Sequence, residues 1–303
     1  MSDVVYAENW DKVLWKTQQH PDNYIPQDFL SSLRKNPNFR PYTYWSLVSL
    51  SCAVTQHLAT ICIFISVFIH LKEQLLDPRT LIWLSVGCFH VGYILWVLLD
   101  PTHIASCERA NSFLKTFKSS ILIFLALMSL SPVLRTLTAS TSSDSIWALS
   151  AILLLLNAIL ADYSILNVQS QLTGRLTSVL SMNAAVSASA VLASRLTTDI
   201  AVFGLMLFAI QSFAVFPFLR YRFQALGLTV KILLTSSLAG SAVWFTVTLS
   251  WKVTCLYTLI FSFVTFLAPA LLMWAQKYKN EIRGPWDVAV PTVNYKHLTF
   301  FQG

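Results

Sequence analysis

Long apolar stretches joined by short polar links dominate the chain between Trp45 and Lys277. Charged residues lie at the edges of these stretches, and a helix of about 20 residues crosses the hydrocarbon core of a bilayer. We expect eight spans, at approximately Trp45–Ile69, Leu81–Leu99, Ser120–Leu134, Ile146–Leu160, Thr177–Ser194, Ile200–Leu219, Ile232–Ser250 and Val253–Trp274. Runs such as Ile152–Leu156 do not alternate polar and apolar residues, as barrel strands would. The pattern predicts an all-α polytopic membrane helix bundle.

The third and fourth of these spans are short for a membrane crossing. We therefore expect one or both to be tilted against their neighbours, or to form a re-entrant pair around Ser131–Ser145. Three regions follow from the pattern: an N-terminal interfacial region at 1–42, a transmembrane bundle at 43–276 and a C-terminal tail at 277–303.

The distribution of basic residues predicts an orientation. Counted over alternate links and the two termini, 16 of the 21 Lys and Arg residues fall on one side and five on the other. Basic residues are retained on the cytoplasmic side, so both termini are expected in the cytosol. The net charge of +7 does not indicate nucleic-acid binding, because the bases do not cluster on an aromatic-bearing soluble surface. Anionic lipids are the expected partners of these charges.

Composition excludes an ordinary soluble enzyme. The hydrophobic fraction is 55%, the charged fraction is 12% and the mean hydropathy is +0.59. The eight glycines are scattered and form neither a Gly-x-Gly-x-x-Gly nor a Walker loop. Acidic residues form no close pair of the Asp-x-Asp kind, and neither the six histidines nor the five cysteines have metal-site spacing. We expect no metal, no cofactor and no self-contained active site, with His57 serving as a hydrogen-bonded packing residue.

The terminal regions carry two short polar motifs. Pro21-Asp22-Asn23-Tyr24 precedes an expected amphipathic helix at Pro26–Asn36, and Gly284-Pro285-Trp286-Asp287 lies in the tail. Such helices commonly lie in the headgroup layer. The N-terminal motif fits either a turn or a ligand contact, since proline fixes one backbone angle and Asp and Asn satisfy nearby amides.

Several polar residues lie inside or at the ends of the spans. The fifth span is rich in Ser and Ala and carries Asn183, which fits either helix packing or a substrate groove. Arg135 and Arg195 end their spans on the side expected to be lumenal, where they can snorkel to the interface. Asp162 and Gln211 are candidates for a headgroup-facing site, because polar groups at membrane depth need a partner or a polar cavity.

Taken in order, these polar motifs resemble a known family. The similarity runs from about Trp10 to Asp287 and is carried by Pro21–Tyr24, Ser131–Thr138, Asp162-Tyr163, Ser181 with Asn183, Leu192–Leu196, Phe208–Gln211 and Gly284–Asp287. The chain resembles the PIG-C family, which is the C subunit of phosphatidylinositol N-acetylglucosaminyltransferase. The tail beyond Val288 and the link at 100–118 depart from the family pattern, so no function is transferred to them.

The resemblance implies a multi-pass protein of the endoplasmic reticulum membrane, in a complex that transfers N-acetylglucosamine from its UDP-sugar to phosphatidylinositol. This is the first step of glycosylphosphatidylinositol (GPI) anchor biosynthesis. The chemistry is assigned in that family to a PIG-A-type glycosyltransferase subunit. PIG-H, PIG-P, PIG-Q and PIG-Y types and a dolichol-phosphate-mannose regulatory subunit are further partners. The resemblance therefore implies a non-catalytic subunit that scaffolds the catalytic chain and helps to position the lipid.

Our hypothesis for the lipid site places phosphatidylinositol at a lateral opening framed by the fourth, fifth and sixth spans. Its expected residues are Asp162, Asn183, Gln211, Arg175, Arg220 and Arg222. The arginines would attract the lipid phosphate. The expected subunit-interface residues are Pro21, Asp22, Asn23, Tyr24, Gly284, Pro285, Trp286 and Asp287.

Two other classes stay open at this point. An independent lipid or small-solute transporter, or a scramblase, also requires polar residues within membrane helices, although no inverted repeat of broken helices supports it. A stand-alone membrane transferase would need an acidic motif in a lumenal loop, and Glu73 with Asp77 matches such a motif poorly.

Overall fold

The computed structural model describes residues 41–99, 106–138, 140–163 and 171–279, together with Thr17, Arg34–Lys35 and Ile282–Arg283. Within these ranges the side chains of 34–35, 106–115, 171–178, 224–225 and 282–283 are not described. The chain divides into two compact units, one formed by Thr43–Leu271 and the other by Met1–Tyr42 with Leu272–Gly303.

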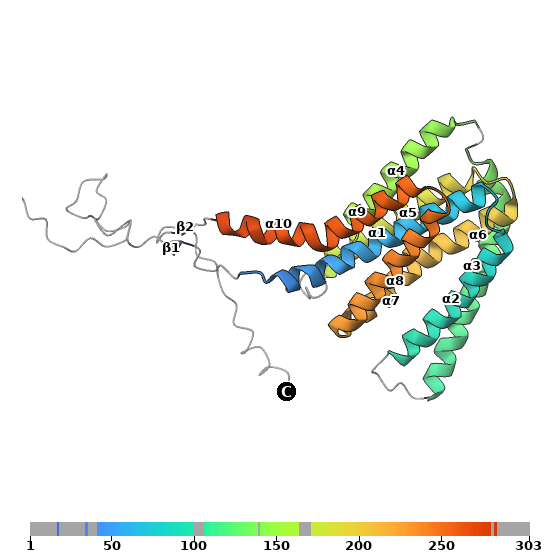
Figure 1. The fold of residues 1–303 in the computed structure, drawn as a ribbon. Coiled ribbons are helices and arrows are strands. Elements are labelled where there is room, and N and C mark those ends of the chain that lie inside the picture. Colours follow the sequence, from blue (N-terminus) through green and yellow to red (C-terminus); the bar gives the residue numbers. More distant parts are fainter. Residues whose placement is uncertain are drawn as a thin grey trace, which may run out of the picture. The chain divides into compact units, whose positions relative to one another are not determined.

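Helices make up nearly all of the first unit (Figure 1). The first five are uninterrupted: α1 (Tyr44–Lys72), α2 (Pro78–Leu98), α3 (Ser106–Thr136), α4 (Ser143–Leu160) and α5 (Gln171–Ala193). A π-helical turn, η2 (Gln211–Val215), joins α6 (Asp199–Ile210) to α7 (Phe216–Ala225), and α8 (Leu228–Val247) follows. The last rod consists of α9 (Trp251–Ser262), the π-helical turn η3 (Phe263–Leu267), α10 (Ala268–Ala275) and the 3-10 turn η4 (Gln276–Tyr278).

These helices correspond one to one with the eight predicted spans. Within the described residues, seven helical segments are long and apolar enough to cross a membrane, and Val179–Ala193 of α5 is a shorter apolar segment. The prediction of an all-α polytopic helix bundle is confirmed.

The re-entrant alternative expected for the third span was wrong. Helix α3 has 31 residues and continues through Pro132 to Thr136, so the chain does not turn back at Ser131. The error arose because the polar residues that begin α3 continue the helix beyond its apolar part, which alone is visible to a hydropathy pattern. The fourth span is short as expected, since α4 has 18 residues.

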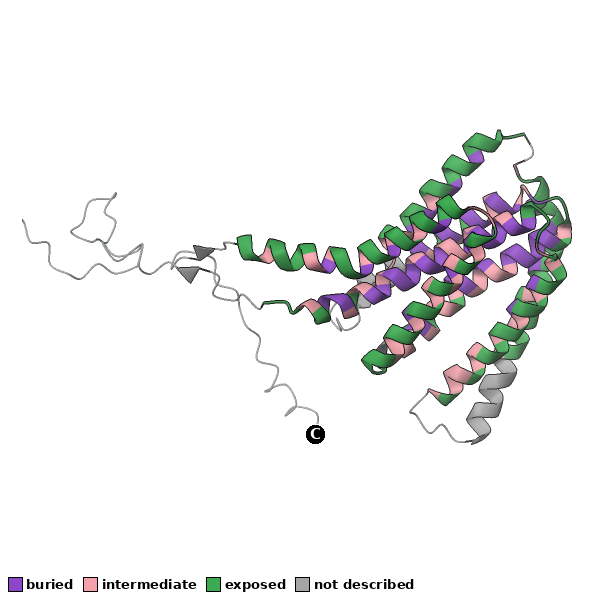
Figure 2. Ribbon diagram, viewed as in Figure 1, coloured by how far each residue is buried: buried purple, intermediate pink, exposed green. Residues whose placement is uncertain are grey.

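Helix α1 lies at the centre of the packed unit. In its most apolar window 67% of the residues are buried, compared with 11–22% for α2, α3, α4, α8 and the α9–α10 rod. Figure 2 shows the buried positions concentrated on α1, α5 and α6. Phe64 and Phe68 of α1 are completely or almost completely buried. The Phe64 ring contacts Phe208 of α6 and Phe213 of η2, and the Phe68 ring contacts Trp147 of α4. Because lipid is as apolar as these side chains, close packing rather than the hydrophobic effect holds such helices together.

Hydrogen bonds between side chains also tie α1 to its neighbours. Thr55 pairs with Thr265 of η3 at 2.8 Å between hydroxyl oxygens, and Gln56 Nε2 donates to Thr235 Oγ1 of α8 at 2.9 Å. Near the other end of α1, His70 Nε2 lies 2.9 Å from Thr248 Oγ1. Polar side chains on membrane helices satisfy one another across helix contacts, and here they fix α1 against the C-terminal third of the bundle.

In the second unit two very short strands pair. Strand β1 (Arg34–Lys35) is antiparallel to β2 (Ile282–Arg283), and Tyr42 N donates to Gln276 Oε1 at 3.0 Å. Most of the amphipathic helix expected at Pro26–Asn36 lies outside the described residues. Its end was predicted wrongly, because Arg34 and Lys35 are extended and their backbone pairs with the tail.

Candidate functional site

Polar side chains from four helices and the link after α4 meet inside the bundle near the end of α7. We call this group the Arg220 cluster; its members are His57, Asn157, Tyr163, Ser181 and Arg220. His57 comes from α1, Asn157 from α4, Ser181 from α5 and Arg220 from α7. All four are buried, and Arg220 retains only 6% of its exposure. Such a concentration of polarity within an apolar bundle is costly unless every group finds a partner.

Asn157 is the centre of the neutral part of this cluster. Its Nδ2 donates to the Ser181 carbonyl at 2.9 Å and to Ser181 Oγ at 2.8 Å, while Ser181 Oγ donates to the Asn157 carbonyl at 2.9 Å. Its Oδ1 lies 3.0 Å from His57 Nε2, which must be the protonated ring nitrogen because an amide oxygen only accepts. Three helices are therefore joined by the hydrogen bonds of one amide group.

Arg220 adds a positive charge beside this network. Its guanidinium is near enough to interact electrostatically with the His57 ring and the Tyr163 phenol. Tyr163 stacks edge-on to His57 with 5.8 Å between ring centroids, and its hydroxyl donates to the Ala158 carbonyl at 2.7 Å. Burial raises the pKa of Tyr163 to about 12 against the opposing effect of Arg220, so the phenol is neutral and supplies no negative charge.

The Arg220 charge is therefore not balanced within this cluster. Among the described residues, the Arg220 side chain forms no hydrogen bond and no ion pair with a carboxylate. An arginine is charged at every physiological pH, and a buried charge without a partner is unfavourable by several kcal/mol. The arrangement can bind an anion, and the planar guanidinium matches two oxygens of a phosphate or carboxylate.

The depth of Arg220 limits which anion can reach it. The apolar segment containing α7 ends at Phe223, three residues after Arg220. A rise of 1.5 Å per residue places Arg220 about 5 Å inside that end of the apolar segment, which corresponds to the boundary between acyl chains and lipid headgroups.

The other predicted lipid residues are distributed around this end of the bundle. The Arg222 guanidinium lies over the Trp96 ring of α2, 4.5 Å from its centroid, and so belongs to a different helix contact. Asp162 is exposed and precedes Tyr163 in the link after α4. Arg175 is in the first turns of α5, but its side chain lies outside the described residues.

Asn183 and Gln211 are not brought to the Arg220 cluster. Two residues along a helix correspond to a rotation of about 200°, so Asn183 lies on the opposite side of α5 from Ser181. Gln211 lies in η2, where its amide donates to the Ser85 carbonyl of α2 at 3.0 Å and accepts from Phe89 N at 3.2 Å. These two backbone groups are one helical turn apart, so Gln211 joins η2 to one turn of α2.

The predicted interface motifs Pro21–Tyr24 and Gly284–Asp287 lie outside the described residues. Their role in contacts between subunits stays a prediction. Sequence reasoning missed Asn157 altogether, although an asparagine directly after the apolar run Leu153–Leu156 is a signal for a buried polar contact. His57 packs through a hydrogen bond, as expected. Within the described part of the chain, no group of three His, Cys, Asp or Glu side chains is arranged to hold a metal.

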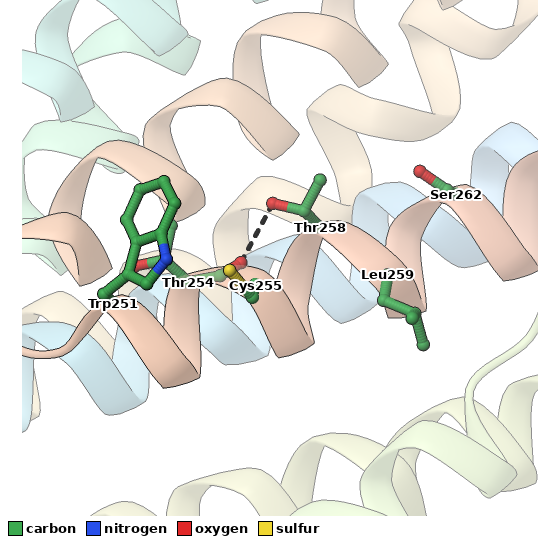
Figure 3. Close-up of a pocket in the computed structure, with 6 residues that line it drawn as sticks. All are labelled: Trp251, Thr254, Cys255, Thr258, Leu259 and Ser262. Carbon is green, nitrogen blue, oxygen red and sulfur yellow. Dashed lines mark hydrogen bonds between the residues drawn. The ribbon is translucent and has the colours of Figure 1, made fainter.

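A groove on α9 does not have the properties of a chemical site (Figure 3). It has a volume of about 340 Å³ and is lined by Trp251, Thr254, Cys255, Thr258, Leu259 and Ser262. All six residues come from one helix, and the Thr258 hydroxyl donates to the Thr254 carbonyl within it at 2.9 Å. The groove contains no charged group and is a feature of the outer surface of α9.

The opposite end of the bundle carries two further arginines, and both have partners. Arg135 of α3 pairs with Asp199 at the start of α6, with 3.0 Å between Nη1 and Oδ1. Arg195 donates to the carbonyls of Thr138 and Thr141 in the link between α3 and α4. Ser131 also bonds the Asp199 carbonyl. These contacts join the links at this end and leave each guanidinium with an internal acceptor.

A family model described as phosphatidylinositol N-acetylglucosaminyltransferase matches residues 10–287. No solved structure matches the chain.

Three curated relatives cover most of the chain. A phosphatidylinositol N-acetylglucosaminyltransferase GPI2 subunit of Schizosaccharomyces pombe is 38% identical over 95% of this chain and 88% of its own length. A protein of Dictyostelium discoideum named as the putative C subunit of that enzyme is 37% identical over 92% of this chain and 79% of its own length. The C subunit of the Homo sapiens enzyme is 35% identical over 92% of each chain. The chain therefore belongs to the phosphatidylinositol N-acetylglucosaminyltransferase family that contains the PIG-C and GPI2 proteins.

Proposed function

We propose that this chain is a membrane subunit of the complex that transfers N-acetylglucosamine from UDP-N-acetylglucosamine to phosphatidylinositol, and that it positions the lipid acceptor through Arg220. Its relatives are named as subunits of that enzyme, and the family match covers nearly the whole chain. The transfer chemistry belongs in this proposal to a PIG-A-type partner, with PIG-H, PIG-P, PIG-Q and PIG-Y types completing the assembly in the endoplasmic reticulum. The positive-inside pattern supports cytosolic termini and a cytosolic Arg220 cluster.

The observation that carries the lipid part of this proposal is the buried, unbalanced charge of Arg220. Phosphatidylinositol supplies a phosphodiester anion in the headgroup layer, close to the end of the apolar segment that contains Arg220. Binding it would balance the guanidinium charge and direct the inositol ring toward the aqueous side. Asp162, the residue before Tyr163, is exposed at this end and has oxygens that accept from inositol hydroxyls.

Holding the acceptor in this way would accelerate transfer without a reacting group on this chain. Fixing the inositol hydroxyl beside the bound sugar donor removes an entropic cost that two freely diffusing reactants would have to overcome. The role therefore requires a rigid headgroup site and a stable attachment to the catalytic chain. The hydrogen bonds centred on Asn157 supply rigidity at the Arg220 cluster.

The test uses the assembled enzyme in membranes, with transfer measured as a function of the mole fraction of phosphatidylinositol. Removing a charge-assisted hydrogen bond costs about 1.5–3 kcal/mol, so Arg220→Gln is expected to raise the half-saturating lipid fraction roughly 10- to 100-fold. Arg220→Lys, which keeps the charge but not the planar fork, should give an intermediate value.

The matched control is Arg222→Gln, because Arg222 lies two residues away over Trp96 and should leave the lipid requirement within about twofold. Intact assembly with an unchanged lipid requirement in Arg220→Gln would rule out the lipid site. Transfer by the purified chain alone would instead contradict the assignment of catalysis to a partner.

A further inference from the structure

Helix α5 presents two polar side chains on its outer face. Asn183 and Ser187 are both exposed, and their separation of four residues places them on one side of the helix, about 6 Å apart along its axis. The opposite face of α5 is closely packed: Ala184, Ala185 and Ala188 are buried there. The two polar residues therefore face away from the bundle.

Neither side chain has a hydrogen-bond partner among the described residues. This separates them from Ser189 on the same helix, whose Oγ donates to the Ala185 carbonyl at 2.7 Å, and from Ser194 directly after it, whose Oγ donates to the Val191 carbonyl at 2.6 Å. Exposed serines on α8 are satisfied in the same way, with Ser237 Oγ 3.0 Å from the Leu234 carbonyl. A serine outside such a contact can still rotate to bond its own helix, but an asparagine amide has two donors and an acceptor to satisfy.

The position of Asn183 places this amide in the apolar layer. It lies within the apolar segment Val179–Ala193, about 15 Å before the end of α5 at Ala193 and about 3 Å along the helix from Ser181, which bonds Asn157. The neighbouring outward residues are apolar: Val179 and Leu180 on α5, and Ile152 and Leu155 on α4, are all exposed. A polar side chain of another polypeptide would meet the bonding capacity of Asn183 among these apolar neighbours.

We propose that the α5 face carrying Asn183 and Ser187 binds a transmembrane helix of another subunit, whose own amide, hydroxyl or protonated carboxyl side chain hydrogen-bonds to Asn183. The occupant is a helix because only a segment that satisfies its own backbone can lie against α5 inside the bilayer. The short side chains of Ser187 and Ala190 along this face permit close approach of such a helix. The inference rests on the proposed function in one respect: it requires the chain to work as a subunit.

The first experiment identifies the occupant. A photoreactive amino acid replaces Ser187 in the full-length chain, expressed in cells that supply the other subunits, and the matched control places it at Ser237 on α8. Irradiation is expected to join position 187, but not position 237, to a different membrane protein of the complex. Adducts only with lipid, or with a second copy of this chain, would overturn the proposal.

The second experiment tests the amide itself. The tagged chain is isolated in mild detergent and the partner that crosslinks to position 187 is quantified. A membrane hydrogen bond of 1–2 kcal/mol corresponds to roughly a 5- to 30-fold loss of recovered partner in Asn183→Leu. Asn183→Gln should retain most of the partner and Ser237→Ala all of it, and equal recovery with Asn183→Leu would contradict the role of the amide.

This outcome is separable from that of the lipid-site test. Arg220→Gln should keep the partner on α5 while changing the lipid requirement, whereas Asn183→Leu should lose the partner before any lipid measurement is made. If Arg220→Gln leaves the lipid requirement unchanged but the crosslink at position 187 is retained, only the lipid site is contradicted. The helix contact is then still supported.

Discussion

Arginines near the two ends of the α6–η2–α7 helix lie in opposite environments. Near its start, Asp199 pairs with Arg135 at 3.0 Å, and both side chains remain more than 40% exposed. Near its end, Arg220 is almost completely buried and interacts electrostatically with His57 and Tyr163, neither of which carries a negative charge. About 31 Å of helix separates Asp199 from Arg220.

This difference in pairing indicates different roles for the arginines at the two ends. At the Asp199 end, Arg135 pairs with a carboxylate and Arg195 donates to two carbonyls of the link between α3 and α4, so both arginines join parts of the chain. At the Arg220 end, the chain buries a charge and surrounds it with neutral groups whose own hydrogen bonds are already made. In the proposed function, an external anion balances this buried charge.

The largest expected effect is on lipid dependence, and it compares the two ends directly. Arg135→Gln removes the same charge as Arg220→Gln, but from a pair that is internal and partly exposed. We expect the half-saturating phosphatidylinositol fraction to rise at least about tenfold for Arg220→Gln and to stay within about twofold for Arg135→Gln. Transfer assays on membranes with equal amounts of assembled enzyme measure this fraction for both variants. Equal increases would show that the two ends do not differ in lipid binding.

The next effect is on stability at the Arg220 end. Asn157→Leu removes the amide that joins α4, α5 and α1 and leaves His57 and Ser181 with unmet bonds. We expect a loss of roughly 2–4 kcal/mol in the free energy of unfolding, since each buried unsatisfied group costs about 1–3 kcal/mol. Thermal unfolding in detergent measures it. The comparison variant is Ser150→Ala, at a buried α4 residue whose hydroxyl donates to the Trp147 carbonyl of its own helix, and a loss no larger than this control would contradict the central role of Asn157.

The smallest effect is expected from the exposed ion pair. Asp199→Asn should lower stability by less than about 1 kcal/mol, because exposed pairs are screened by water and salt. Unfolding at low and high salt tests this, with Asp144→Asn as a control at an exposed acidic residue in the first turn of α4. A loss comparable to that of Asn157→Leu would show that the Asp199 end is stabilised by charge as strongly as the Arg220 end is by hydrogen bonds.

Much of the fold was predictable because membrane helices are recognisable by their length and hydropathy. Seven of the eight predicted spans have bounds within a few residues of those of a helical segment. The exception is α3, whose polar N-terminal turns extend beyond the apolar pattern. The candidate site was predictable only in part. Arg220 was identified from its position at a span end, but Asn157 was not, since no spacing rule connects it to His57, 100 residues earlier.

The sequence by itself determined the class of the protein, the order of its apolar helices and its family, because these depend on local hydropathy and on motifs in linear order. The tertiary structure decided which polar residues meet. In α5, Ser181 faces the bundle and Asn183 faces away from it, and Gln211 bonds to the α2 backbone. Arg220 is buried, whereas Arg135 pairs with a carboxylate. The rotation of each helix about its axis sets these outcomes, and it is determined by packing between segments distant in the chain rather than by the segments themselves.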